Sequence, residues 1–336
     1  MSTFDGAVTD RGRVSLGRGF AVASVALGGA GMVLLAGFAG WDFLIESLAL
    51  NFGALAVMLG MLTWLMIPTQ SRNGSVWAIA WAALFSALFT SGVAVAVLVT
   101  RRAIPGLSFA EFEQLSPADL PTLASFAVSF RFWPVVPAFW LPLTLGLLLF
   151  PTGHPPTPRW KWVGWWSILA IALASTATAV AQNPWSTLPI SSGESTVPGM
   201  LGSLNDTGFL LASIAALASI VSLVVRYRRS VGVERSQIRW IAFGGAVYVV
   251  ALMFGDNVQG TPVVDALTGF GVQATLVASY GIAITKYRLY DIDVVISRTV
   301  AYGVLAGFIT GVYALVVVGI GSLLGGGDEP NLALSI

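Results

Sequence analysis

Long apolar stretches separated by short charged gaps constrain this chain more than any other feature. The runs are 16 to 26 residues long, and a helix needs about 20 apolar residues to cross a hydrocarbon core of ~30 Å. Only 10% of the residues are charged, against about 25% in soluble domains. The sequence therefore predicts an all-α fold, a polytopic transmembrane helical bundle of about nine spans, at residues 20–40, 47–67, 76–100, 132–151, 163–183, 207–225, 240–255, 264–285 and 299–324.

No shift in composition divides the chain into separately folded domains. We expect a cytoplasmic N-terminal tail over 1–19, a transmembrane domain over 20–324, and an outer turn with the start of a truncated tenth helix over 325–336. Pro330 precedes a new apolar run and suits the first turn of a helix. A short natural tail lying on the membrane is the alternative interpretation of these last residues.

Positive charge alternates between the gaps and predicts how the chain is threaded. Fourteen of the seventeen Lys and Arg residues fall in the N-terminal tail and the even-numbered gaps, whereas three fall in the long third gap, residues 101–131. Cytoplasmic loops carry the excess of Lys and Arg. We therefore expect a multi-pass protein of the cell membrane with a cytoplasmic N-terminus.

The third gap is the largest predicted extramembrane segment. Ser108 and Glu111 have the spacing of a capping box, which predicts a short helix starting at residue 109. Phe109, Phe112 and Leu115 then fall on one face of that helix. The segment is interpreted either as an outer lid over a ligand pocket or as simple packing over the bundle.

The predicted spans lack the residues that carry most membrane chemistry. None has an Asp, Glu, Lys, Arg or His in its middle, although such residues usually mark pumps and transporters. We expect Asn51 to hydrogen-bond a neighbouring helix and the single histidine, His154, to be a solvated loop residue. The chain has no cysteine. The sequence predicts no catalytic residue, no cofactor, no metal site and no nucleic-acid partner.

Three weaker patterns have alternative interpretations. Asp256 and Asp265 flank a short outer gap and would suit an ion site if both face water. Asp291 and Asp293 form a D-x-D pair, which can hold Mg²⁺ with phosphates but is explained more simply by ion pairing with nearby basic residues. Most of the twelve tryptophans lie at span ends, as in an interfacial belt; an aromatic cage of Trp133 and Trp140 is the alternative.

Two predicted inner segments are strongly patterned. The gap at 226–239 holds five arginines and one glutamate, and each basic residue near an anionic leaflet adds ~1 kcal/mol of attraction. We expect contacts with anionic lipids of the inner leaflet from Arg226, Arg228, Arg229, Arg235 and Arg239. Residues 285–303 mix charged and apolar positions and predict a short amphipathic helix along the inner surface.

Three inner segments resemble a known family. They are "LFPTGHPPTPRW" at 149–160, "GVERSQIRW" at 232–240 and "KYRLYDIDVVISRTVAYG" at 286–303. In order and spacing they are similar to the multi-span N-terminal membrane region of actinobacterial sensor histidine kinases, which belong to two-component systems. The resemblance covers roughly residues 140–336.

The resemblance implies a sensory input module that couples an envelope or extracellular signal to a cytoplasmic transmitter. The parent would be a homodimeric, ATP-dependent protein histidine kinase, but the transmitter and its catalytic residues are absent from this sequence, and the signal ligand is unknown. We expect residues 285–303 to couple the two parts, through Arg288, Tyr290, Asp291, Asp293 and Arg298. A transporter or permease and a non-catalytic membrane scaffold are the alternative functions.

Overall fold

The computed structural model describes residues 2–40, 43–44, 48–181, 183–185, 200–255 and 262–285. The chain divides into two compact units, Met1–Tyr287 and Arg288–Ile336, so all the described residues belong to the first unit. Every regular element among them is helical.

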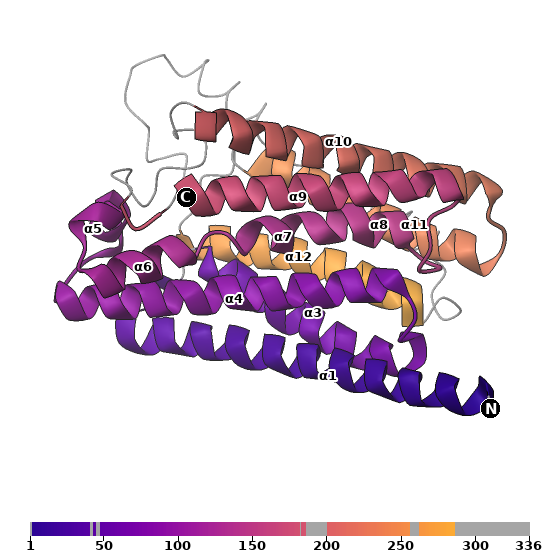
Figure 1. Ribbon diagram of the computed structural model, residues 1–336, viewed down its shortest axis with the longest axis horizontal. Coiled ribbons are helices and arrows are strands. Elements are labelled where there is room, and N and C mark those ends of the chain that lie inside the picture. The colour runs from indigo at the N-terminus through magenta and orange to yellow at the C-terminus, as the bar shows by residue number, and fades with distance from the viewer. Residues whose placement is uncertain are drawn as a thin grey trace, which may run out of the picture. The chain divides into compact units, whose positions relative to one another are not determined.

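Long helices dominate this unit (Figure 1). The order is α1 (Ser2–Leu34) and the π-helical turn η1 (Leu35–Ala39), α3 (Ala49–Gln70), α4 (Gly74–Ala103), α5 (Phe109–Gln114), η2 (Pro117–Asp119), α6 (Thr122–Phe130), α7 (Val135–Leu141), η3 (Pro142–Gly146), α8 (Leu147–Leu149), η4 (Pro158–Trp160), α9 (Lys161–Ala181), α10 (Met200–Arg229), α11 (Val233–Gly255) and α12 (Pro262–Thr285).

Small residues let the helices approach closely. α1, α3 and α4 contact one another, α9 packs along α10, and α12 contacts both α11 and α3. A Cβ added to Gly28 of α1 would lie 2.9 Å from the Cβ of Ala56 on α3, and one added to Gly208 of α10 would lie 2.8 Å from the Cα of Ala174 on α9. Such contacts are typical of membrane helices, where small residues bring backbones together.

Six helices in the described residues are long and apolar enough to cross a membrane. They are Asp10–Ala39, Ala49–Gln70, Gly74–Ala103, Thr122–Leu149, Pro158–Ala181 and Gly202–Arg229. They match the first six predicted spans in order, but the predicted count of about nine is not supported. Within the described residues, α12 holds a shorter apolar stretch, Gln273–Ile284, and α11 begins among the arginines of the predicted sixth gap. The ninth predicted span and residues 325–336 lie outside the described residues.

Helices extend past three predicted span ends that had been placed at charged residues. The tail over 1–19 is helical from residue 2. The gap at 226–239 consists of two helix ends joined through 230–232. The fourth apolar segment begins at Thr122 rather than at 132, and it includes Arg131. Arginine is a good helix former, so helices extend through these charged positions.

Apolar side chains also cover much of the outside of these helices. Val33, Leu65, Leu169, Leu210 and Leu217 are each more than 60% exposed. A helix that is apolar on its outward face as well as on its buried face is typical of a membrane span. The long apolar helices, together with their apolar outer faces, indicate a membrane-embedded protein.

Candidate functional sites at the two ends of the bundle

The turn at residues 148–154 is held by polar side chains from two other parts of the chain, and we call this arrangement the clamp. From one side, Asn73 Nδ2 donates to the carbonyl oxygen of Pro151 at 2.8 Å. Asn73 is also the N-cap of α4, because its Oδ1 accepts the backbone N–H of Ser75 at 3.0 Å. One side chain thus fixes both the start of α4 and the turn.

From the other side, Arg226 of α10 reaches into the same turn. Its guanidinium donates to Thr152 Oγ1 at 2.6 Å, to the carbonyl oxygen of Leu148 at 3.3 Å and to that of His154. Only 8% of Arg226 is exposed. Arg226 was predicted to contact anionic lipid, but in this structure its guanidinium is occupied by the turn.

Close backbone contact explains a glycine in the clamp. Gly153 has a φ of +81°, and a Cβ there would lie 2.8 Å from the Cα of Asn73 and 2.9 Å from the backbone nitrogen of Gly74. A left-handed backbone conformation and an adjacent backbone both favour glycine. The motif "LFPTGHPPTPRW" therefore contains a residue whose identity is required by the contact between two turns.

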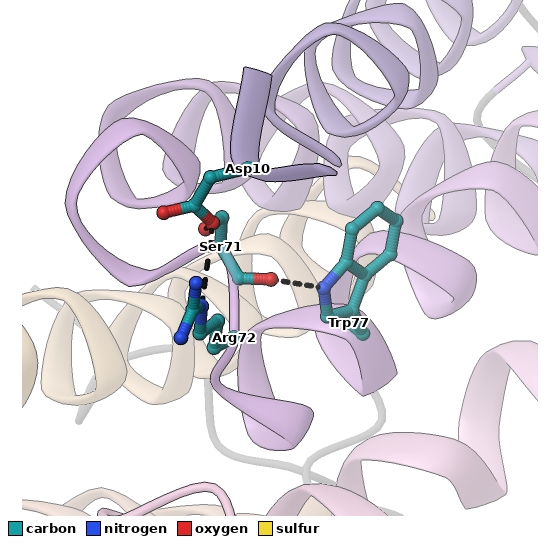
Figure 2. A network of polar contacts seen from close by, with 4 residues as sticks. All are labelled: Asp10, Ser71, Arg72 and Trp77. Atoms are coloured by element: carbon teal, nitrogen blue, oxygen red, sulfur yellow. Dashed lines mark hydrogen bonds and ion pairs between the residues drawn. The ribbon is translucent and has the colours of Figure 1, made fainter. Parts of the chain in front are cut away.

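Near the clamp, a second network joins α1 to the α3–α4 turn (Figure 2). Ser71 Oγ donates to Asp10 Oδ1 at 2.5 Å, and Arg72 Nε lies 3.6 Å from the same oxygen. Trp77 Nε1 donates to the carbonyl oxygen of Ser71 at 2.8 Å. The Asp10 and Arg72 side chains are 45% and 66% exposed, so this ion pair contributes little stability and serves mainly to position the helix ends.

At the opposite end, residues 104–121 form a cap that includes α5 and η2. The predicted capping box is confirmed: Ser108 Oγ accepts the backbone N–H of Glu111 at 3.3 Å, and Glu111 accepts the backbone N–H of Ser108 at 2.9 Å. These hydrogen bonds from Ser108 lower the pKa of the Glu111 carboxyl from its ordinary value. Phe112 is 2% exposed and belongs to the buried cluster at this end. The cap is thus packed on the bundle.

Beneath the cap lies a buried arginine that the sequence analysis had placed in an outer gap. Arg131 follows α6 directly and is only 5% exposed. Its guanidinium carbon lies 4.3 Å from the ring centre of Phe132 and 5.1 Å from that of Phe112, and the carboxylate of Glu113 attracts it electrostatically. Its Nη1 has no hydrogen-bond partner in the described part of the chain. The only feature of the sequence that marked this position was the positive charge of Arg131, and that charge was interpreted as the boundary of a span.

The other predicted site residues are dispersed. Arg228, Arg229 and Arg235 are exposed and Arg239 is half-buried, so their predicted lipid contacts stay predictions. His154 is exposed, as expected. The predicted coupling residues Arg288, Tyr290, Asp291, Asp293 and Arg298, as well as the Asp256 position, lie outside the described residues.

Side-chain contacts bear on one further expectation, for Asn51, and on one alternative interpretation, the aromatic cage. Asn51 Oδ1 is buried without a hydrogen-bond partner among the described residues, so the expected bond to a neighbouring helix is absent there. Trp133 packs against Phe85 and Phe130, whereas Trp140 packs against Phe139 and Phe209. The two tryptophans thus have separate aromatic partners.

In the described residues, the contacts of the clamp, of the Asp10 network and of the cap join helices and turns to one another. In the described ranges, no group of three His, Asp or Glu residues is placed to hold a metal ion. No family model, no curated protein and no solved structure matches this chain.

Proposed function

We propose that this chain is the membrane sensory module of a sensor histidine kinase, with the cap outside the cell and the clamp at the cytoplasmic face. The main support is the clamp. One of the three segments that resemble the kinase family is also the turn where side chains from α4 and α10 converge. Such a turn suits a point where several helices must move together.

The cap and the clamp are connected by two elements, α4 and the segment Thr122–Leu149. α4 begins at Asn73 in the clamp, and near the cap its Gly92 approaches Arg131, so that an added Cβ would lie 3.2 Å from the Arg131 Cα. The segment Thr122–Leu149 contains Arg131 and leads directly into the clamped turn. A displacement of the cap would therefore reach the clamp through small helix shifts, which are a common way to transmit signals.

α12 connects this pathway to the predicted coupling segment. Tyr280 Oη donates to the carbonyl oxygen of Pro142 at 3.2 Å, within the π-helical turn η3, and the Tyr280 ring lies 5.7 Å from that of Phe150. π-helical turns occur frequently at functional sites. α12 ends at Thr285, the first residue of the predicted coupling segment 285–303, so a movement of the 142–150 region would be passed to that segment.

The test begins with the DNA that follows the codon for Ile336. We expect an open frame that encodes another apolar helix and a histidine-bearing transmitter. Its full product, reconstituted in vesicles, should become phosphorylated on histidine with ATP. Replacing Tyr290 and Asp291 with alanine should change the rate of phosphorylation at normal protein levels. An unchanged rate, or a product without ATP-dependent phosphorylation, would refute the sensory role.

A transporter is the second candidate, and Arg131 is the observation that favours it. A buried arginine within an apolar segment, at a break between two helices, is a feature of transporters. Uptake of an anionic solute into vesicles by the wild-type chain, lost in Arg131→Met, would favour transport over sensing.

A further inference from the structure

We infer that the groove between the last turns of α1–η1 and α4 binds one anionic phospholipid from the surrounding bilayer. The groove has a volume of about 370 Å³ and lies at the cap end. Its apolar walls include Leu34, Phe38, Ala94 and Val97, and Arg101 and Arg102 lie at its end. This site is independent of the sensory role, because lipid binding can be measured without a transmitter.

The groove has the two-part character of an amphiphile. On α4, Ala94, Val97 and Arg101 are spaced three and four residues apart, which places them on one face. The apolar floor thus continues for about 10 Å along the helix axis before it meets the guanidinium groups. Both α1 and α4 belong to the membrane-crossing helices, so an acyl chain can enter the groove sideways from the hydrocarbon region.

The positive charge of Arg101 and Arg102 favours the phosphate of the lipid headgroup at this end of the groove. None of the described residues that line the groove is acidic. Arg101 already donates from Nη1 to the carbonyl oxygen of Ala39 at 2.6 Å, which ties α4 to the end of η1. Arg102 is exposed, and no hydrogen bond or ion pair of its guanidinium is seen in the described part of the chain. Arg102 is therefore the cation available for a phosphate, and Arg101 adds to the local positive field.

Phe38 provides an exposed apolar surface at the wall of the groove. Its side chain is 69% exposed although it lies at the groove wall. A lipid chain in the groove would cover this ring, whereas the neighbouring side chains of the protein do not. A general interfacial role of the two arginines, without a defined lipid, is the competing explanation, because long cationic side chains often extend toward headgroups.

Native mass spectrometry of the detergent-purified chain, titrated with phosphatidylglycerol or phosphatidylcholine, separates these explanations. We expect one retained phosphatidylglycerol per chain and weaker retention of phosphatidylcholine. Arg102→Gln should weaken phosphatidylglycerol binding about fivefold, and Phe38→Ala should also weaken it.

The matched controls are Arg159→Gln and Phe130→Ala, which change an exposed arginine and an exposed phenylalanine outside the groove. Both should bind phosphatidylglycerol like the wild type. Equal retention by all variants, equal weakening in the controls, or no preference for the anionic lipid would overturn the proposal. Displacement of the lipid by millimolar inorganic phosphate would show that the site takes free phosphate, which would also overturn it.

Discussion

Two buried arginines in the described residues differ in what surrounds the guanidinium group. Arg226 donates three hydrogen bonds to the turn at 148–154, although its buried Nε has no hydrogen-bond partner in the described residues. Arg131 has aromatic rings on two sides and an Nη1 without a partner in the described residues. A buried charge is costly unless it is hydrogen-bonded. Loss of the arginine should therefore have different consequences at the two positions.

At Arg226, substitution by alanine should destabilise the protein. The Leu148 and His154 carbonyl groups and the Thr152 hydroxyl would lose a charged donor, and such losses cost about 2–3 kcal/mol. Thermal unfolding in detergent should show a clearly lowered midpoint. Arg229→Ala, an exposed position one turn away, should change stability by less than about 0.5 kcal/mol. Equal effects of the two substitutions would show that the clamp does not hold the turn.

At Arg131, substitution by methionine should leave stability unchanged or raise it. Replacing a buried charge by an apolar side chain of similar volume is often neutral or stabilising by about 1–4 kcal/mol. The same unfolding assay tests this expectation. If Arg131→Met lowers the unfolding midpoint as much as Arg226→Ala does, then the ring contacts of Arg131 stabilise the fold and a role in function is not needed to explain it.

Among the secondary-structure elements, local patterns were predictable and helix ends were not. The capping box at Ser108 and Glu111 was predicted correctly, because it depends on two residues three positions apart and on nothing distant. The 226–239 segment was predicted as a gap between two spans, whereas α10 continues to Arg229 and α11 begins at Val233. Which helices meet, and through which glycines, depends on tertiary contacts that no local pattern contains.

The capping box gives a prediction about pH. The lowered pKa of Glu111 means that its carboxylate favours the docked α5 above the ordinary pKa of 4.5, and that this contribution is lost as the pH falls through the lowered value. Ser108→Ala removes the hydroxyl that bonds this carboxylate and should raise the pKa toward its ordinary value. Titration of the labelled Glu111 carboxyl by carbon-13 NMR measures it. The backbone N–H of residue 108, which is the larger cause of the lowered pKa, stays in the variant, so the rise in pKa should be partial. An identical pKa would contradict the contribution of the Ser108 hydroxyl.

Two helical glycines form a matched pair. Alanine at Gly208 would place a Cβ within 3 Å of the backbone of Ala174, and overpacking of this kind costs about 1–3 kcal/mol. Alanine at Gly29 meets nothing within 4 Å and should be neutral or stabilising, because alanine is the better helix former. Unfolding midpoints in detergent should separate the two variants. The close approach of α9 and α10 would be refuted if Gly208→Ala were as stable as Gly29→Ala.

For the whole molecule, the length of the apolar runs predicted more of the fold than the pattern of charge did. The length of the apolar runs predicted a helical membrane protein and the order of its first six long helices, because the bilayer sets that length. The pattern of charged residues did not predict that Arg131 is buried within an apolar segment, because a buried arginine cannot be told from a loop arginine by sequence alone. The clamp was also missed, since Asn73 and Arg226 are brought together only by the folded bundle.

The alternation of positive charge remains the basis of the proposed threading, and one experiment tests it most directly. The chain has no cysteine, so a single introduced cysteine is an unambiguous label. Gln114 in α5 and Val231 between α10 and α11 are both exposed, and they report on the cap and on the end of the bundle that holds the clamp. We would treat intact cells with a membrane-impermeant maleimide. Gln114→Cys should be labelled in intact cells and Val231→Cys only after permeabilisation; the reverse pattern, or labelling of both in intact cells, would contradict the account.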